Sequence, residues 1–144
     1  MFLNIFATHP IYPILYGLLS PNTTRPRVFE TIERDSKGKL WFTSAEMIFQ
    51  IDITSLKVRK VIDVFHRKKP TYIDLSSFID KRGTFWYGTW GLGLFRVDLA
   101  SGRVRNYGTE SGLGVSCIAN GIAQGSGDSL WIAAHDDGLK RFDP

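Results

Sequence analysis

The sequence predicts an all-β fold built from a repeated unit. Three of its four tryptophans, Trp41, Trp86 and Trp131, follow one another at intervals of 45 residues, and the segments DSKGKLWFTS, DKRGTFWYGT and GSGDSLWIAA align around them. In LWF, FWY and LWI the neighbours of each tryptophan are also apolar, so both faces of these strands need cover. Four-stranded units that are covered on both faces and recur every 40 to 50 residues or so are typical of a β-propeller.

Each unit is expected to contain four short antiparallel strands. The first runs through VFETIERD, YIDLSSFID or CIANGIAQ, and the second contains the tryptophan. The third is MIFQID, LGLFRVD or GLKRFD, and the fourth is VRKVIDVF or VRNYGT. The units cover residues 26–70, 71–115 and 116–144, and the last one has no fourth strand. The expected architecture is therefore a β-propeller repeat array of three blades, the last incomplete, forming an open arc and not a closed ring.

Turn residues support the first hairpin of two units. Asp35 with Gly38, and Asp80 with Gly83, occupy the first and fourth positions of a type I turn, where the aspartate side chain caps backbone amides. The third unit has the glycine-rich segment GSGD instead, so its turn should differ in detail. A further aspartate ends the third strand of each unit: Asp52, Asp98 and Asp143.

Composition narrows the classes of function. The formal net charge of +4 comes mainly from the short groups KVRK and HRKK among apolar residues, which is typical of solvated turns, so no nucleic-acid partner is expected. Cys117 is the single cysteine, which excludes an intrachain disulfide and a cysteine-rich metal site. A phosphate loop, a nucleophile elbow and zinc-ligand spacing are all absent from the sequence. We therefore predict no catalytic residue, no metal and no cofactor.

Residues 1–25 form an apolar leader with some features of an export signal. The stretch has no lysine or arginine before Arg25, and Asn4, His9, Pro10 and Pro13 interrupt its apolar run. A secretory signal needs a basic start and an unbroken apolar run, and a membrane span needs about 20 apolar residues. The leader is a weak export signal on this reading; the alternatives are an ill-packed leader and a remnant of a missing blade.

The repeat frame resembles the two-component regulator propeller family. Its pattern is a Gly-Leu pair, a strand, a D-x-x-G turn, Leu-Trp-Ile-Gly-Thr, a second Gly-Leu pair and an aromatic-Asp ending. The resemblance covers residues of about 27 to 144, although WFTS lacks the glycine and WIAA lacks both the glycine and the threonine. The matching residues are Gly112, Leu113, Asp80, Gly83, Trp86, Gly88, Thr89, Gly93, Leu94, Phe142 and Asp143.

The resemblance implies a sensory role. Proteins of this family carry their propellers outside the cytoplasmic membrane, as the sensing part of hybrid histidine kinases that often respond to glycans. The expectation is a non-catalytic, periplasmic or extracytoplasmic ligand-sensing segment, linked to the membrane only through a longer parent protein. Because two apolar sheet faces would stay open, the expected partners are the missing blades of that parent chain or a homo-oligomer that completes the ring. A glycan or another small molecule is the expected ligand.

Candidate binding residues lie in the loops of one rim of the arc. The loops between second and third strands contain Trp90 in the second unit and His135, Asp136 and Asp137 in the third, with Glu46 in the first. Trp90 is not required by the repeat, since Ala45 and His135 occupy the equivalent places. An exposed indole beside polar groups suits stacking on a sugar ring, whereas the structural alternative is that it caps the edge of the barrel.

Two other classes of function stay open. Streptogramin lyase-like enzymes resemble this frame too and act from the same rim with a histidine; His135 would be the candidate for that role. A propeller scaffold that binds proteins through its rim is the third class. The segment HDDG at 135–138 could also supply a general acid and base pair or metal ligands. Adjacent aspartates before a glycine, however, are commonly turn formers whose side chains point apart.

Overall fold

The computed structural model describes residues 30–44, 47–55, 57–65, 72–111, 113, 118, 121–135 and 137–144, with only the backbone for 72–75. These residues form three antiparallel sheets whose strands follow chain order. The first contains β1 (Ile32–Arg34), β2 (Leu40–Ser44), β3 (Met47–Asp52) and β4 (Lys57–Asp63). The second contains β5 (Tyr72–Ile79), β6 (Thr84–Trp90), β7 (Leu94–Asp98) and β8 (Val104–Tyr107), followed by the 3-10 turn η1 (Thr109–Ser111). The third contains β9 (Gly121–Gln124), β10 (Leu130–Ala134) and β11 (Gly138–Phe142).

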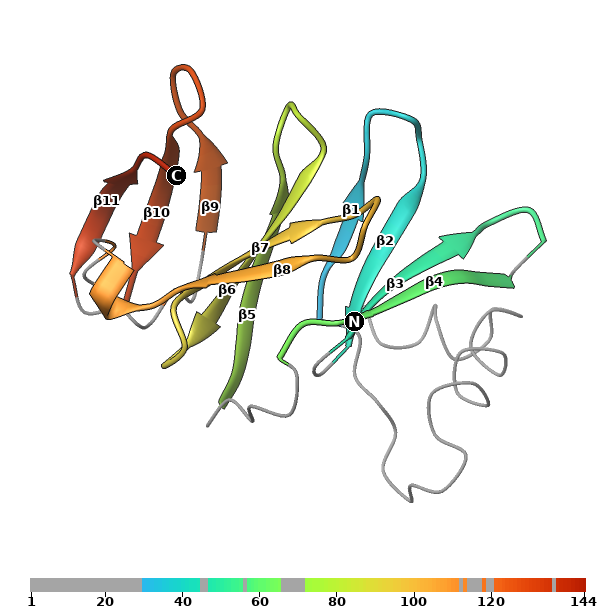
Figure 1. Ribbon diagram of the computed structural model, residues 1–144, viewed down its shortest axis with the longest axis horizontal. Helices are drawn as coiled ribbons and strands as arrows, with labels where there is room; N and C mark the ends of the chain where they lie inside the picture. Colours follow the sequence, from blue (N-terminus) through green and yellow to red (C-terminus); the bar gives the residue numbers. More distant parts are fainter. Residues whose placement is uncertain are drawn as a thin grey trace, which may run out of the picture.

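The three sheets stand side by side as the blades of an open arc (Figure 1). The first strand of each blade is the innermost, since β5 lies against both β1 and β9. The predicted fold class is therefore confirmed: an all-β array of three antiparallel blades, with three strands in the last. Within the described residues, no helix is long and apolar enough to cross a membrane.

Each of the first two blades carries the same turn between its first and second strands. Gly38 has φ 78° and Gly83 has φ 80°, and the amide of each donates to the carbonyl of the aspartate three residues earlier at 2.9 Å. In the second blade, Asp80 Oδ1 accepts the amides of Arg82 and Thr84, both at 2.9 Å. Its Oδ2 accepts the indole N–H of Trp86 at 2.8 Å. The aspartate thus joins the turn to the buried tryptophan.

Blades 1 and 2 pack through one aromatic and aliphatic cluster. Trp41 and Ile48 of the first blade face the second, where Phe85, Tyr87 and Val97 are buried against them. Polar contacts flank this cluster. Lys60 Nζ donates to the carbonyl of Leu99 at 2.7 Å, and Ser77 Oγ donates to Glu33 Oε1 at 2.6 Å. The partly buried Glu33 carboxyl has a raised pKa because loss of solvent outweighs the opposing hydrogen bond from Ser77.

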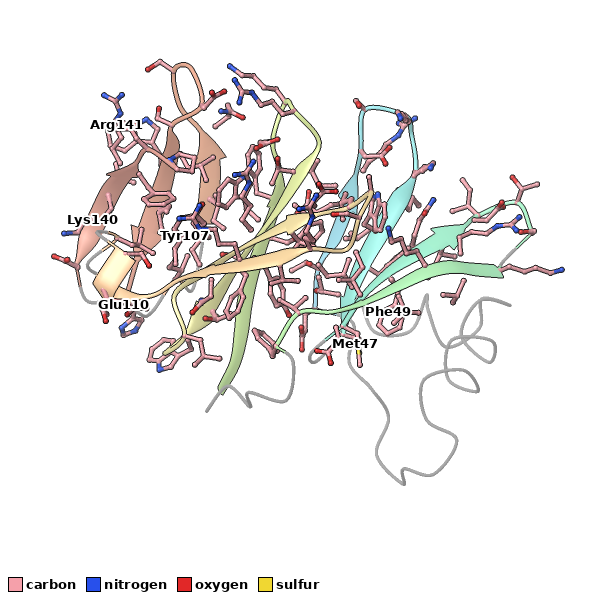
Figure 2. The ribbon with its side chains drawn as sticks, viewed as in Figure 1. Met47, Phe49, Tyr107, Glu110, Lys140 and Arg141 are labelled. Carbon is pink, nitrogen blue, oxygen red and sulfur yellow. The ribbon has the colours of Figure 1, made fainter. Side chains whose placement is uncertain are left out.

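Blades 2 and 3 pack through the opposite face of the second sheet. Trp86, Leu94 and Tyr107 contact Ile122, Leu130, Ile132 and Phe142. The Tyr107 and Phe142 rings meet edge to face, with centroids 5.1 Å apart, and Tyr107 is labelled in Figure 2. The approach is close at Gly88, where a Cβ atom would lie 2.5 Å from Cγ2 of Ile118. The same Cβ would also lie 2.6 Å from Ser76 Oγ on β5, so packing within blade 2 and between blades 2 and 3 both favour glycine here.

The repeated tryptophan always faces the next blade along the chain. Trp41 packs on blade 2 and Trp86 on blade 3, and their exposed fractions are 3% and 1%. Trp131 lies on the equivalent face of blade 3, where its exposed fraction is 41% and that of Leu139 is 67%. The LWI strand is therefore covered on one face only within the described residues, and its other face is the open apolar face expected at the end of an arc.

Candidate functional site

The rim loop that carries Trp90 is braced from several sides. It joins β6 to β7 and turns at Gly91 and Gly93, which have φ values of 93° and 77°. Thr89 donates its amide and its Oγ1 hydroxyl to the carbonyl of Gly93, at 3.0 and 2.8 Å. The side-chain amide of Asn106 on β8 donates to the carbonyl of Leu92 at 2.8 Å. These bonds hold the backbone under Trp90 in one conformation.

The fold brings Trp90 and His135 together from different blades. Trp90 ends β6 of the second blade, and His135 directly follows β10 of the third. Their ring centroids are 4.3 Å apart with an interplanar angle of 61°. The Trp90 side chain is half-buried and the His135 side chain is exposed. Two of the predicted site residues therefore form one aromatic pair that spans the rim between blades 2 and 3.

The remaining candidates are less closely associated. Asp137 is exposed and forms an ion pair of 2.6 Å with Lys140 on the same hairpin, which is the role of a solvated turn residue. Glu46 and Asp136 lie outside the described residues. Among the described residues, no group of three or more histidine, cysteine, aspartate or glutamate side chains is placed to hold a metal ion. The chemistry that the rim offers is stacking and hydrogen bonding to a flat, polar molecule.

The aspartates that end the third strands cap the turns that follow. Asp52 Oδ1 accepts the amides of Thr54 and Ser55 at 3.0 and 2.8 Å, and Oδ2 accepts from the Arg59 guanidinium at 2.9 Å. The Ser55 amide and then the Arg59 guanidinium hold the pKa of Asp52 well below its usual range.

The other blades show variants of this cap. Asp98 accepts the amides of Ala100 and Ser101 at 2.9 Å each, and the bond from the Ser101 amide is the main cause of its lowered pKa. Asp143 has instead an exposed ion pair of 3.4 Å with Arg141. These residues serve the repeat, not a ligand site.

Sequence reasoning missed three contacts of this framework. The indole bond of Asp35 to Trp41, at 3.0 Å, has a signal that could have been used, since an aspartate stands six residues before the tryptophan in two units. Thr89 was noted as a repeat residue, but its bond across the rim loop was not foreseen. The brace from Asn106 has no sequence signal, because the fourth strand of the first unit has Lys60 at the equivalent place in the sequence.

Comparisons with known proteins identify structural neighbours only. No protein-family model and no curated protein sequence matches this chain. The extracellular domains of two proteins assigned to hybrid two-component systems of B. thetaiotaomicron each superpose with a TM-score of 0.60, at 22% and 24% identity over 81% and 83% of this chain. A catalytically inactive His-to-Ala variant of virginiamycin B lyase from Staphylococcus aureus, solved with quinupristin, gives a TM-score of 0.59 at 20% identity over 85% of this chain.

These similarities support the propeller fold. The chain spans 17% and 16% of the two extracellular domains and 43% of the lyase. At these identities the comparisons support the arrangement of the blades only.

Proposed function

We propose that the chain is a non-catalytic, ligand-sensing propeller segment of a two-component signalling protein, acting outside the cytoplasm, with a glycan as ligand. The Trp90–His135 pair carries the proposal. It presents an indole and an imidazole at a rim loop, and the two rings belong to different blades. Similarity to extracellular domains assigned to hybrid two-component systems supports the sensory setting.

A ligand on this pair would act on the packing of two blades. It would contact the β6–β7 loop and the β10–β11 loop together, and the Thr89 carbonyl already accepts the amide of residue 118 of the third repeat unit at 2.8 Å. Binding energy could therefore change how tightly blades 2 and 3 associate. Such a change could act as the signal, because a ligand that binds one arrangement of the two blades more tightly than the other shifts the equilibrium between them.

The test is binding of the protein to an array of neutral and acidic oligosaccharides, followed by titration of the strongest binder. Trp90→Ala is expected to lower affinity about tenfold, because one aromatic stacking surface contributes about 1 to 3 kcal/mol. Trp131→Ala is the control, since it also removes an indole but one that lies on the open face of blade 3. Unchanged binding by Trp90→Ala together with a loss of thermal stability would assign Trp90 to the barrel edge instead.

A propeller enzyme is the second candidate, favoured by one observation. His135 is exposed on the rim, and the similar lyase loses activity when a histidine is replaced by alanine. If the chain has this activity, quinupristin should be converted by the wild-type protein and not by His135→Ala, as followed by liquid chromatography and mass spectrometry. Unchanged quinupristin with wild-type protein would reject this candidate.

We also propose that the open face of blade 3 receives another blade, from a longer parent chain or from a second copy. Trp131 and Leu139 expose apolar surface where the equivalent Trp41 and Trp86 are covered. Self-association would appear as a concentration-dependent mass in analytical ultracentrifugation and would be abolished by Leu139→Lys. A mass that stays monomeric at every concentration would leave the parent chain as the source of the blade.

A further inference from the structure

A cleft of about 1000 Å³ opens between blades 1 and 2, away from the Trp90 rim. Its walls are the β1–β2 turn and the inner face of blade 1 on one side, and the β5–β6 and β7–β8 turns of blade 2 on the other. The Lys60 bond to the Leu99 carbonyl shows that blades 1 and 2 meet there. The cleft is separate from the loops used in the proposed sensing role.

The cleft is strongly basic. Its described lining includes seven cationic residues and only two acidic ones, Asp35 and Asp98, although the side chains of Arg96 and Arg105 lie on the face of blade 2 that is turned toward blade 3. The cationic residues are Lys37, Lys39, Lys60, Arg82, Arg96, Arg103 and Arg105. Such a concentration of one sign of charge in a concave surface raises the local concentration of anions.

Several of these cations already have partners. Lys60 Nζ donates to the carbonyls of Leu99 and Ala100, and Arg82 forms an exposed ion pair with Asp128. The Arg96 guanidinium lies over the Trp86 ring, 5.8 Å from its centroid, and the Arg105 guanidinium lies 4.7 Å from the centroid of Tyr107.

Three others make no direct polar contact through their side chains with any described residue. Within the described part of the chain, the side chains of Lys37, Lys39 and Arg103 make no hydrogen bond and no ion pair. Lys37 and Lys39 come from blade 1 and Arg103 from blade 2, so the unpaired cations approach the cleft from both sides.

The two carboxylates form no direct ion pair with these cations, although Asp35 attracts Lys39 and Asp98 attracts Arg103 at longer range. Asp35 is occupied by the Trp41 indole and by the backbone amides of Lys37 and Lys39, at 2.9 to 3.0 Å. Partial burial alone would raise the pKa of Asp35, but these hydrogen bonds together lower it below its ordinary value. Asp98 is occupied by the amides of its own turn. Both carboxylates are hydrogen-bonded within their turns, and cationic residues outnumber them in the lining, so the cleft keeps an excess of positive charge.

We propose that this cleft binds a small ligand with two or more phosphate groups, held by Lys37, Lys39 and Arg103. A phosphate group brings up to about two negative charges and three acceptor oxygens, and a guanidinium fork and lysine ammonium groups both suit it. The aromatic ring in the cleft, Trp41, is only 3% exposed and offers almost no surface for stacking. Recognition therefore rests on charge, which favours an oligophosphate over a nucleobase or sugar ring. The volume is at the upper end of the range for small-molecule sites.

The experiment is isothermal titration of the 144-residue chain with sodium tripolyphosphate at about 0.15 M salt. The double variant Lys37→Gln/Lys39→Gln is expected to lower affinity about tenfold or more, and Arg103→Gln about fivefold, because charge-assisted hydrogen bonds are lost. The control matched to Arg103→Gln is Lys81→Gln, which also removes one positive charge, from an exposed residue of the β5–β6 turn that does not line the cleft. It should change affinity less than about twofold. Circular dichroism checks that each variant is folded.

Three results would overturn the proposal. Equal loss of affinity in Lys81→Gln would mean that net charge alone attracts the probe. Equal affinity for a glutamate peptide of the same total charge would mean that the cleft binds acidic peptides and not phosphate. No binding heat at this salt concentration, with wild-type protein that is folded, would mean that the cleft is not an anion site. None of these outcomes bears on the Trp90 variants, which lie at the other rim.

Discussion

Replacing Asp80 with alanine should weaken the whole second blade. The change removes three hydrogen bonds at once, from the Arg82 amide, the Thr84 amide and the Trp86 indole. Trp86 is only 1% exposed, so its N–H would lose its acceptor inside the protein, which costs about 1 to 3 kcal/mol. The two turn amides resemble a cap, whose loss costs about 1 kcal/mol. Together the expected fall in the free energy of unfolding is about 2 to 4 kcal/mol.

The parts of this effect can be separated. Asp80→Asn keeps one oxygen for the two turn amides but places an NH₂ group where the indole needs an acceptor. It should therefore lose only the indole contribution, about 1 to 3 kcal/mol. Asp128→Ala is the control, because Asp128 lies in the corresponding turn of blade 3 and its side chain forms only an exposed ion pair with Arg82. Its expected cost is about 0 to 1 kcal/mol.

Urea unfolding followed by far-UV circular dichroism measures these differences, provided that all variants share one slope. The order of stability should be Asp128→Ala, then Asp80→Asn, then Asp80→Ala as the least stable. If Asp80→Ala is no less stable than Asp128→Ala, the hydrogen bonds of Asp80 to the turn and to the Trp86 indole do not stabilise the second blade.

Three further changes test other parts of the structure in the same assay. Gly88→Ala should cost about 1 to 3 kcal/mol because its Cβ would meet both Ile118 and Ser76. Gly121→Ala, with its nearest neighbour at 4.0 Å, should cost less than about 0.5 kcal/mol. Equal costs would contradict the close packing around Gly88. Trp86→Ala should lower the free energy of unfolding by about 3 to 5 kcal/mol and Trp131→Ala by about 1 kcal/mol, since only Trp86 is buried. The reverse order would show that the face of blade 3 that carries Trp131 is covered. The pKa of Asp98 is lowered in the folded state, so its contribution to folding stability is present above the unfolded pKa and is lost as pH falls through the folded pKa. The free energy of unfolding should therefore fall below about pH 4, and less steeply in Asp98→Asn than in the wild type. Identical pH profiles of the two proteins would refute the role of Asp98 as a cap.

The blade plan could be predicted from the sequence because it is local and repeated. The 45-residue spacing of the tryptophans, and the Asp and Gly residues of the turns, determine strand order within each unit. Backbone geometry then requires antiparallel neighbours, as observed. What a single unit does not encode is which face of the sheet meets which neighbour. Trp41 and Trp131 stand at equivalent places, yet one is buried and the other exposed, because burial depends on a second sheet.

The candidate site was predictable only in part. Trp90 stood out because its ring departs from the repeat, and His135 because it occupies the equivalent place one unit later. Their contact at 4.3 Å depends on how two loops from different blades approach each other, which no spacing reveals. The basic cleft was missed for the same reason. Lys37 and Arg103 are far apart in the chain and look like ordinary turn residues until blades 1 and 2 are packed.

The repeated tryptophans of the first two blades face the blade that follows, so the two faces of each blade are not equivalent. Trp41 inserts toward the sheet that follows it, and Trp86 does the same. A blade placed beside Trp131 would meet an exposed indole where the equivalent Trp41 is covered by the cluster that contains Phe85 and Tyr87. Because the two faces of a blade carry different side chains, the two ends of the arc present chemically different surfaces.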